Sequence, residues 1–284
     1  MCIRDRLNIL ITGANGQLGS SLRRLGGVSP HNYLFTDVAE LDITDAAAVL
    51  RTVEERRIDV IVNCAAYTDV ERAEEDEPTA ELLNHKAAGN LAAAAKATGA
   101  TLFHVSTDYV FDGTAEVHDE DEPLSPLSVY GQTKAAGDIA VANAPEHYIL
   151  RSSWVIGEGH NFVKTMIRLG KERDSLGVIF DQVGTPTYAN DLAQAIFAII
   201  NKGIVRGVYH FSNEGVCSWY DFTVAIHRLA GITSCKVKPL HTAEYPTRAN
   251  RPAYSVLDKT KIKTTFGIEI PHWEESLKRC IDTL

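Results

Sequence analysis

The sequence of 284 residues contains few cysteines, and their positions suit neither a disulfide framework nor a structural zinc site. The five cysteines stand at positions 2, 64, 217, 235 and 280. Their number is odd and no two form a Cys-x-x-Cys pair, which favours a reducing compartment such as the cytoplasm. The ten histidines show no His-Glu-x-x-His or other tight ligand spacing, so we expect no metal site.

Basic charge is also scarce. The chain has 28 Lys and Arg against 37 Asp and Glu, a formal net charge of −9. Proteins that bind nucleic acid need a basic face, so we do not expect nucleic acid as a partner. No apolar run reaches the roughly 18 residues of a membrane span, so we expect no membrane partner either. Residues 1–6 are charged and do not resemble a secretory signal, and we expect them to be a non-native leader.

What the sequence does contain is a regular alternation of strand and helix patterns. Short β-branched apolar runs predict strands, and Ala-rich or amphipathic segments predict helices between them. The predicted strands are 7–12, 33–36, 60–63, 101–106 and 148–151, and the predicted helices are 17–25, 46–56, 78–98 and 129–142. This alternation is typical of βαβ units, so we predict an α/β fold with a doubly wound parallel sheet.

The alternation of strand and helix patterns becomes less regular after Trp154. Helices are predicted at 161–169, 189–201, 219–230 and 273–281, with short strands between them. We interpret residues 7–153 as a dinucleotide-binding domain and residues 154–284 as a smaller, mainly substrate-binding lobe that is partly interleaved with it. No linker rich in Gly, Ser or Pro separates the two parts, so we expect them to share an interface with the site in the cleft between them.

A glycine-rich turn, residues 13–19 (GANGQLG), follows the first predicted strand and opens a helix. Gly13 and Gly16 would let backbone N–H groups approach a pyrophosphate at the helix N-terminus. The spacing is Gly-x-x-Gly-x-x-Gly, and a strand–helix turn that needs a positive φ would explain the glycines as well. The strand before the turn and the helix after it favour cofactor binding.

Three further positions suit a dinucleotide. Asp37 ends the second strand, where a carboxylate can accept hydrogen bonds from the ribose 2′-OH, which favours NAD over NADP. Asp42 could bond the adenine amine while Ile43 packs on the ring, or Asp42 could merely start the next helix. Small residues at 64–66 leave room for a ligand at the end of the third strand. Cys64 there fits a buried apolar side chain better than a nucleophile.

Two motifs suit acid–base chemistry on a carbonyl group. Tyr130 and Lys134 stand four residues apart on a predicted helix and share one face. A cation one turn away is expected to lower the pKa of a tyrosine and make it useful near neutral pH. An exposed helix pair would have the same spacing. Ser106 and Thr107 close the fourth strand, where a hydroxyl could bond a substrate carbonyl or simply cap the strand. The order of these motifs along the chain favours catalysis.

Together these motifs resemble the extended short-chain dehydrogenase/reductase family, and within it the dTDP-4-dehydrorhamnose reductases. The stretches that carry the likeness are NCAAYTDVERAEED (63–76), VSTDYVFDG (105–113), PLSVYGQTKAAGD (126–138), LRSSWVIGEGHNFVKTM (150–166), DQVGTPTYANDLA (181–193), GVYHFSNEGVCSWYDF (207–222) and RPAYSVLDKTKIK (251–263). They cover nearly the whole chain from Leu7. The resemblance implies a Rossmann-type doubly wound parallel sheet with a smaller C-terminal substrate-binding lobe.

The resemblance also implies roles for individual residues. For the cofactor, NADPH or NADH, it implies Gly16, Gln17 and Leu18 at the pyrophosphate, Asp37, Asp42 and Ile43 at the adenosine, and Ala65, Ala66 and Tyr67 along the groove. For catalysis it implies Tyr130 as proton donor, Lys134 as its activator and ribose clamp, and Thr107 as the carbonyl hydrogen-bonder. For the substrate it implies Thr107, Asp108 and Trp154 at the sugar and, more weakly, Arg251 at the nucleotide diphosphate.

The activity implied is reduction of the C4 ketone of dTDP-4-dehydro-6-deoxy-L-mannose to dTDP-L-rhamnose by NAD(P)H. The resemblance allows for a homodimer. Some members of the family build a magnesium-dependent dimer on a glutamate in the first helix, where this chain has Ser21, so no metal is carried over. Two alternatives stay open. An epimerase or dehydratase of the same fold is disfavoured by Tyr109 after Thr107-Asp108. A non-catalytic subunit like the regulatory subunit of methionine adenosyltransferase is disfavoured by the intact Tyr130/Lys134 pair.

Overall fold

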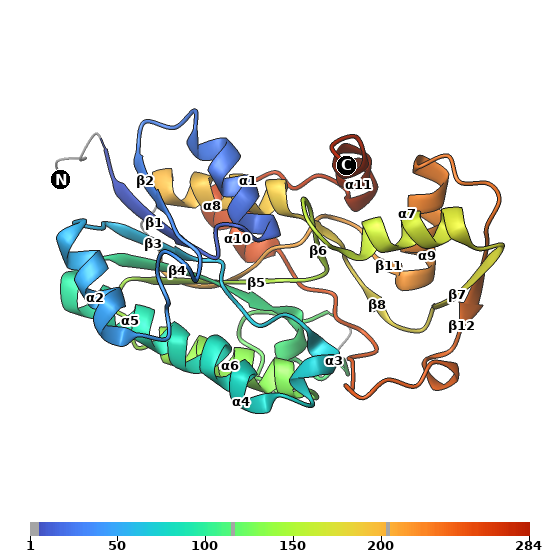
Figure 1. Cartoon of the computed structure of the whole chain (residues 1–284), viewed down its shortest axis with the longest axis horizontal. Coiled ribbons are helices and arrows are strands. Elements are labelled where there is room, and N and C mark those ends of the chain that lie inside the picture. The colour runs from blue at the N-terminus through green and yellow to red at the C-terminus, as the bar shows by residue number, and fades with distance from the viewer. Residues whose placement is uncertain (1–5, 115–116, 203–204) are drawn as a thin grey trace.

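The computed structural model describes residues 6–114, 117–202 and 205–284 (Figure 1). The leader expected at residues 1–6 lies outside these ranges except for Arg6. Six parallel strands form a central sheet in the order β10-β5-β4-β3-β1-β2. They are β1 (Asn8–Thr12), β2 (Asn32–Phe35), β3 (Val60–Asn63), β4 (Thr101–Thr107), β5 (His147–Ser152) and β10 (Gly207–His210). This sheet confirms the predicted α/β class.

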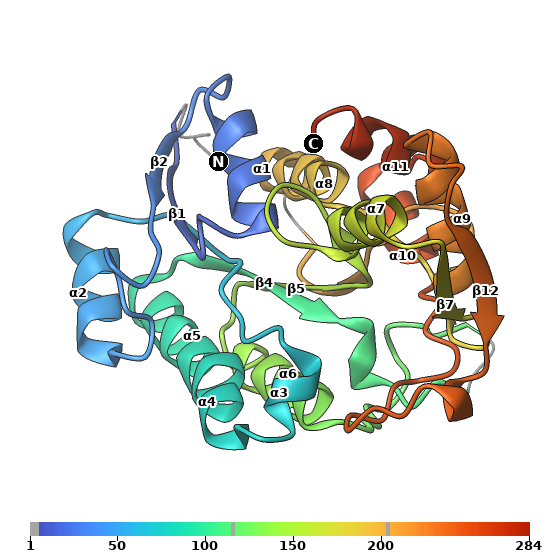
Figure 2. The ribbon, with the colours of Figure 1, turned by 45° about the vertical axis from the view of Figure 1, so that its right-hand side comes forward.

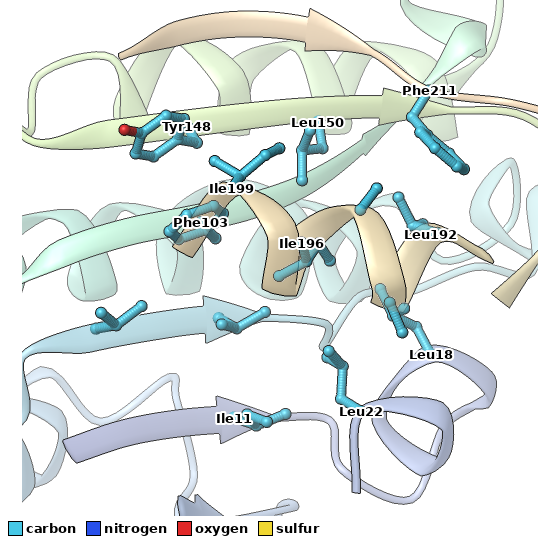
Figure 3. Packing of buried hydrophobic residues seen from close by; sticks show 14 of the residues in the cluster. Ile11, Leu18, Leu22, Phe103, Tyr148, Leu150, Leu192, Ile196, Ile199 and Phe211 are labelled. Carbon is cyan, nitrogen blue, oxygen red and sulfur yellow. The ribbon is translucent and has the colours of Figure 1, made fainter. Parts of the chain in front are cut away.

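Helices cover both faces of the sheet, as Figures 1 and 2 show. One face carries α1 (Gln17–Gly26), α8 (Ala189–Lys202) and α10 (Thr260–Phe266), and the other carries α2 (Ala46–Glu55), α5 (Ala87–Thr98) and α6 (Val129–Val141). Each face buries its own apolar cluster. In the first cluster, Leu22 of α1 and Ile196 of α8 pack toward Phe103 of β4 (Figure 3). The sheet is therefore doubly wound, as predicted.

The second lobe stands beside the sheet, to the right in Figure 1. Its helices are α7 (Phe162–Glu172), α9 (Trp219–Leu229) and α11 (Trp273–Ile281). Its short strands pair as β7 (Ser175–Ile179) with β12 (Lys236–Leu240), β8 (Val183–Gly184) with β11 (Cys217–Ser218), and β6 (Val155–Ile156) with β9 (Thr187–Tyr188). Phe222, Trp273 and Leu277 belong to its separate apolar cluster. None of the helices in the described ranges has the length and apolar character needed to cross a bilayer.

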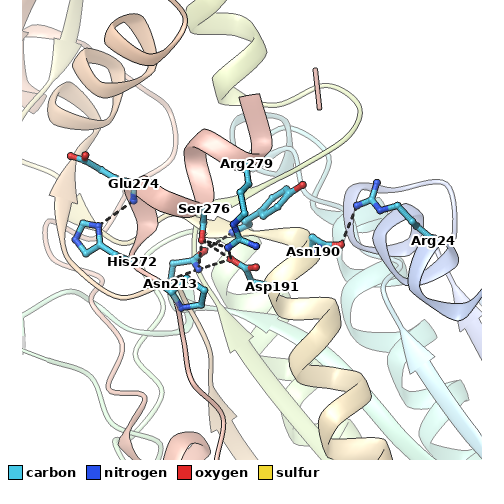
Figure 4. A network of polar contacts seen from close by, with 10 residues as sticks. Arg24, Asn190, Asp191, Asn213, His272, Glu274, Ser276 and Arg279 are labelled. Atoms are coloured by element: carbon cyan, nitrogen blue, oxygen red, sulfur yellow. Dashed lines mark hydrogen bonds and ion pairs between the residues drawn. The ribbon is translucent and has the colours of Figure 1, made fainter. Parts of the chain in front are cut away.

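A buried polar network joins the two parts of the molecule (Figure 4). Asp191, in the first turn of α8, accepts hydrogen bonds from Asn213 at 2.8 Å and from Ser276 of α11 at 2.6 Å. The same carboxylate pairs with Arg279 of α11 at 2.8 Å. These contacts all reach Oδ2 of Asp191 and fix α11 against the N-terminus of α8, because losing any one partner would leave the buried charge less well paired.

The chain differs from the expected element pattern in three places. The helix predicted at 78–98 is divided into α4 (Glu77–Glu81), a π-helical turn (Leu82–Lys86) and α5. Short helical segments at α3 (Val70–Ala73), Asp108–Val110 and Thr242–Glu244, and the helix α10, were not predicted. Strand β10 completes the main sheet from within the second half of the chain. Its four residues lie where the sequence pattern is loose, which is why the pattern did not assign it to the sheet.

We predict that Ile196→Ala lowers the free energy of unfolding by about 2–5 kcal/mol, the usual loss when a buried isoleucine becomes alanine. Ile196 lies on α8, and its side chain is fully buried against the sheet. Urea unfolding followed by circular dichroism measures the change. Val224→Ala on α9 is the control, because Val224 is 41% exposed and should cost less than about 1 kcal/mol. Equal losses in the two variants would contradict the packing described for α8.

Candidate active site

A cavity of about 820 Å³ lies along the carboxyl ends of the sheet strands. The strand order reverses between β1 and β3, and such a switch point is where open α/β sheets bind ligands. Thirteen of the sixteen predicted site residues line the cavity: Gly13, Gly16, Gln17, Leu18, Asp37, Asp42, Ile43, Ala65, Ala66, Thr107, Tyr130, Lys134 and Trp154. The structure thus brings residues from six separate stretches of the chain to one site.

The glycine-rich turn forms one wall of this cavity. Gly13 has a φ of 61°, and a Cβ atom added there would lie 2.6 Å from the backbone nitrogen of Ala65. A Cβ atom at Gly19 would lie 2.4 Å from the carbonyl oxygen of Gly13. Gly16 is the N-cap of α1, and no side-chain cap covers that helix end. The turn therefore presents backbone and a helix N-terminus to the cavity, which suits a pyrophosphate.

The predicted adenosine end is acidic. Asp37 accepts hydrogen bonds from the backbone N–H of Asn15 at 3.0 Å and of Val38 at 2.9 Å, so its carboxylate also holds the glycine-rich turn against β2. Among the described residues that line the whole cavity, Lys134 is the only lysine or arginine. A 2′-phosphate at this end would meet carboxylates, and no lysine or arginine of the described residues lines that part of the cavity.

Asp42 does not cap the next helix, and its contact with adenosine stays a prediction. Its Oδ1 atom accepts hydrogen bonds from the N–H of Thr44 at 2.9 Å and the hydroxyl of Thr44 at 2.7 Å, which lower the pKa of Asp42. It therefore shapes the turn that leads to α2, but the N-cap of α2 is Asp45, which accepts from Ala47 and Ala48. Asp42 also lines the cavity and stays available to a ligand.

Lys134 and Tyr130 lie on α6, whose N-terminus is capped by Ser128. The ammonium of Lys134 donates a hydrogen bond to the Val105 carbonyl of β4 at 2.7 Å. Lys134 is 2% exposed, and burial lowers its pKa to about 8 while the charge of Asp138 opposes that shift. The protonation of a buried lysine with a lowered pKa depends on the charges of the neighbouring groups.

The pKa of Tyr130 does not follow the sequence-based expectation. Burial raises it to about 12, and the hydrogen bond with Thr107 only partly offsets this. Our expectation that Lys134 lowers the pKa of Tyr130 was wrong. Desolvation dominates the pKa, and the Lys134 ammonium is hydrogen-bonded to the Val105 carbonyl. Tyr130 is therefore protonated at neutral pH. A protonated phenol is the form that can donate a proton to an oxygen on which negative charge develops.

Thr107 ends β4 and caps the short 3₁₀ turn that follows. Its hydroxyl accepts from the N–H of Tyr109 at 3.2 Å and donates to Asp108 Oδ1 at 3.0 Å. Asp108 is buried, which raises the pKa of its carboxyl group to about 6. Thr107 lines the cavity whereas Asp108 lies behind it. The structure thus places Asp108 where it orients the Thr107 hydroxyl.

Tyr67 and Arg251 also lie off the cavity wall. Arg251 pairs with Glu71 of α3 at 2.5 Å, an ion pair that the sequence pattern did not indicate. Trp154 lines the cavity with a φ of 45°, unusual for a bulky residue, and its ring stacks on Trp219 with centroids 3.5 Å apart. The strained backbone at Trp154 is located where the second lobe meets the cavity.

The sequence analysis missed Asn84, which the π-helical turn carries. Its side chain accepts from the N–H of Tyr67 at 2.8 Å and donates to the Tyr67 carbonyl at 3.1 Å and the Thr133 hydroxyl at 3.1 Å. Thr133 in turn donates to the carbonyl of Tyr130 at 3.0 Å. Asn84 therefore ties the loop after β3 to the catalytic helix. An asparagine inside an Ala-rich helix was a usable signal, because such residues are costly there unless bonded.

The loop Glu158–His160 also lines the cavity and had no predicted role. Within the described ranges, no group of three or more His, Cys, Asp or Glu side chains is placed to hold a metal ion. Ser21 is buried in α1, and its hydroxyl donates to the carbonyl of Gln17 at 3.2 Å. Cys64 lines the cavity with a pKa raised to about 12 by burial, which disfavours a thiolate nucleophile.

We predict that Asn84→Ala lowers kcat by about 10- to 100-fold, because small displacements of a catalytic group have effects of this size. It should also lower the free energy of unfolding by about 1–3 kcal/mol through the unpaired buried backbone groups of Tyr67. Steady-state kinetics and urea unfolding measure the two effects. Asn143→Ala is the control, because the exposed Asn143 makes one local hydrogen bond, to Ile139. A normal kcat in a destabilised Asn84→Ala protein would show that Asn84 has only a structural role.

Comparison with known proteins gives a consistent result. The family model described as the RmlD substrate binding domain matches residues 7–284. A dTDP-4-dehydrorhamnose reductase of Aggregatibacter actinomycetemcomitans is 44% identical, with 95% of this chain and 97% of the relative covered. A crystal structure of a dTDP-4-dehydrorhamnose reductase from Clostridium acetobutylicum is 46% identical with a TM-score of 0.95, covering 98% and 99% of the two chains. The enzyme of that name from Bacillus anthracis, in complex with NADP, is 39% identical with a TM-score of 0.93, covering 98% and 100%.

Proposed function

Because this chain belongs to the RmlD family, we propose that it uses NADPH or NADH to reduce the C4 ketone of dTDP-4-dehydro-6-deoxy-L-mannose to dTDP-L-rhamnose. This is an oxidoreductase reaction of dTDP-rhamnose biosynthesis. The observation that carries the proposal is the single cavity that Tyr130, Lys134 and Thr107 share with the glycine-rich turn. Groups suited to acid–base chemistry and a turn suited to a dinucleotide thus share one cavity, which supports the proposal.

The cavity fits a nicotinamide dinucleotide. Gly16, Gln17 and Leu18 at the start of α1 would hold the pyrophosphate, and Gly13 leaves no room for a side chain beside that position. Asp37, Asp42 and Ile43 would meet the adenosine, with Ala65 and Ala66 along the groove. Tyr67 lies behind this wall and would act through its backbone bonds to Asn84. When bound, the reduced nicotinamide supplies the hydride that the ketone carbon accepts.

The side chains of the protein then supply the proton and stabilise the charge that develops during the reaction. Tyr130, protonated at neutral pH, donates its proton to the carbonyl oxygen as negative charge develops there. The Thr107 hydroxyl donates its one proton to Asp108 and would turn that proton to the same carbonyl oxygen when substrate binds. Lys134 holds the cofactor ribose and stabilises the phenolate that Tyr130 leaves behind. The chain thereby supplies the proton to the substrate from a site that is shielded from bulk water.

For the sugar and its nucleotide we propose contacts from both lobes. Trp154 and Thr107 face the cavity and suit the sugar ring. Arg251 would reach the diphosphate only by sharing or leaving its ion pair with Glu71. We further propose a cytoplasmic setting, supported by Cys64, Cys217, Cys235 and Cys280, which are all free thiols. A homodimer also remains a prediction.

The proposed reaction is tested by following NADPH and NADH oxidation with the dTDP-ketosugar and, in parallel, with GDP- and UDP-ketosugars. We expect turnover with the dTDP compound and a loss of about 10²- to 10⁴-fold in kcat in Tyr130→Phe, the usual contribution of a general acid. Cofactor affinity should be retained in that variant. Turnover of another nucleotide sugar alone would contradict the substrate, and less than a fivefold loss at every pH would remove Tyr130 from its role.

We predict that Asp37→Ala shifts cofactor preference toward NADPH. The carboxylate can bond the ribose 2′-OH and repels a 2′-phosphate, and no lysine or arginine of the described chain lines that end of the cavity to compensate. The change should appear in KM more than in kcat, because adenosine contacts are equal in the ground and transition states. The ratio of kcat/KM for the two cofactors is the quantity to measure. If the ratio changes in Asp42→Ala but not in Asp37→Ala, Asp42 alone recognises the adenosine.

A further inference from the structure

The catalytic helix carries a third buried ionisable residue that the proposed chemistry does not use. Tyr130, Lys134 and Asp138 follow one another at intervals of four residues on α6 and so share one face of the helix. Lys134 and Asp138 are each 2% exposed. Asp138 does not line the cavity and lies one helical turn beyond Lys134 on the same face of α6. A buried carboxylate in this position needs an explanation, because burial without sufficient partners is costly.

Several groups around Asp138 favour its ionised form and oppose the effect of burial. Arg151 of β5 donates from Nε to Asp138 Oδ2 at 3.1 Å. His104 of β4 lies with Nε2 3.8 Å from Asp138 Oδ1. Burial raises the pKa of Asp138, whereas the charges of Arg151 and Lys134 and the hydrogen bond from Arg151 oppose that shift. The carboxylate therefore lies between two cations, of which only Lys134 reaches the cavity.

The orientation of His104 can be worked out from its neighbour Asn63. The Oδ1 atom of Asn63 accepts from the Thr12 hydroxyl at 2.7 Å and from the N–H of Ala65 at 3.2 Å. The amide nitrogen of Asn63 must then face His104 Nδ1, 3.0 Å away, and donate to it. His104 Nε2 consequently carries the proton and points toward Asp138. Burial and the charge of Lys134 lower the pKa of His104 well below its usual value, so the ring is neutral and adds no third cation.

The arrangement is poorly suited to stability alone. Among the described residues, Asp138 Oδ1, His104 Nε2 and Arg151 Nη1 are buried without a hydrogen-bond partner. Buried ion pairs with unsatisfied atoms contribute little net stability compared with apolar residues of the same volume. Their electrostatic effect on a neighbouring group is nevertheless large, because charges interact strongly where water is excluded. The neighbouring group here is the ammonium of Lys134.

We propose that Asp138 is a positioning residue whose carboxylate keeps the Lys134 ammonium charged and aligned behind Tyr130. This inference rests on the proposed function for the role of Lys134, but the protonation of Lys134 can be measured without any substrate. The ionisable or charged groups around Lys134 and Asp138 are Tyr130 on α6, Cys64 after β3, His104 on β4 and Arg151 on β5, and Asp108 acts on Tyr130 from the turn after β4. Asp138 is the carboxylate whose charge raises the pKa of Lys134.

The first readout is the titration of Lys134 in the full-length apoprotein. Lysine labelled with ¹³C at Cε is followed by NMR from pH 6 to 10, and the Lys134 signal is assigned by its loss in Lys134→Met. We expect a midpoint near the value of about 8 in the wild type and a midpoint at least one pH unit lower in Asp138→Asn. Asp138→Glu, which restores a carboxylate, should return the midpoint toward the wild-type value. An unchanged midpoint in folded Asp138→Asn would overturn the proposal.

The control is Asp191→Asn. Asp191 is also a buried aspartate paired with an arginine, Arg279, but it lies in the network between α8 and α11 rather than behind the cavity (Figure 4). Its replacement should lower the melting temperature and leave the Lys134 midpoint where it was. An equal shift in Asp191→Asn would show that loss of any buried carboxylate changes Lys134, and that outcome would also overturn the proposal.

The second readout is the pH profile of kcat/KM in the complete enzyme. The charged form of Lys134 is the active one, so activity falls as the pH rises through its midpoint. In Asp138→Asn this fall should begin at least one pH unit earlier, which lowers activity about tenfold on the alkaline limb relative to the plateau. A uniform loss at every pH would indicate a merely structural role and contradict the proposal.

Should Asp138→Asn fail to fold, Arg151→Gln gives an independent test. It removes the cation that competes for Asp138 and leaves the carboxylate to Lys134. We expect the Lys134 midpoint to stay at or above the wild-type value. A lower midpoint in this variant would overturn the proposal, because it would make the intact ion pair with Arg151, rather than the carboxylate, the feature that keeps Lys134 charged.

Discussion

The close approach of Gly13 to Ala65 is the constraint on which the site depends. The two backbones meet where β1 and β3 end, and even a Cβ atom at Gly13 would lie 2.6 Å from the nitrogen of Ala65. The helices that follow these strands, α1 and α5, cover opposite faces of the sheet, so the chain diverges at this point and leaves a crevice. The same glycine directs the N-terminus of α1 into the crevice. The lack of space for a side chain at Gly13 is thus linked both to the crevice and to the helix N-terminus that suits an anion there.

A row of polar residues supports the floor of the site. Thr12, Asn63 and His104 are register partners on β1, β3 and β4, and their side chains are hydrogen-bonded in sequence. Apolar residues would pack these positions at lower cost, since each buried polar atom must find a partner. At the end of the row, His104 Nε2 lies 3.8 Å from Asp138 Oδ1 on α6. Asp138 shares that helix with Lys134, so the polar row of the sheet continues to α6. Asn84 also contacts α6, through its hydrogen bond to Thr133.

The sequence was sufficient for features that depend on local pattern. The alternation of strands and helices gave the sheet class, and motifs at strand ends gave most residues of the cavity wall, because parallel strands bring their carboxyl ends to one edge. It was insufficient where geometry is tertiary. The π-helical turn at Asn84 changes no helical periodicity, and β10 is recognisable only through its pairing with β5. The raised pKa of Tyr130 depends on burial, which spacing along a helix does not encode.

The two halves of the chain are interleaved in the structure. The chain leaves the sheet after β5, enters the second lobe at β6, and returns with α8 and β10 before leaving again. The N-terminus of α8 is fixed to α11 by the buried Asp191 network, while its C-terminal half packs on the sheet through Ile196 and Ile199. The predicted division at residues 153 and 154 does not separate two layers, because α8, β10 and α10 from the second part pack with the main sheet. Because α8 belongs to both parts, it holds the second lobe to the sheet beside the cavity.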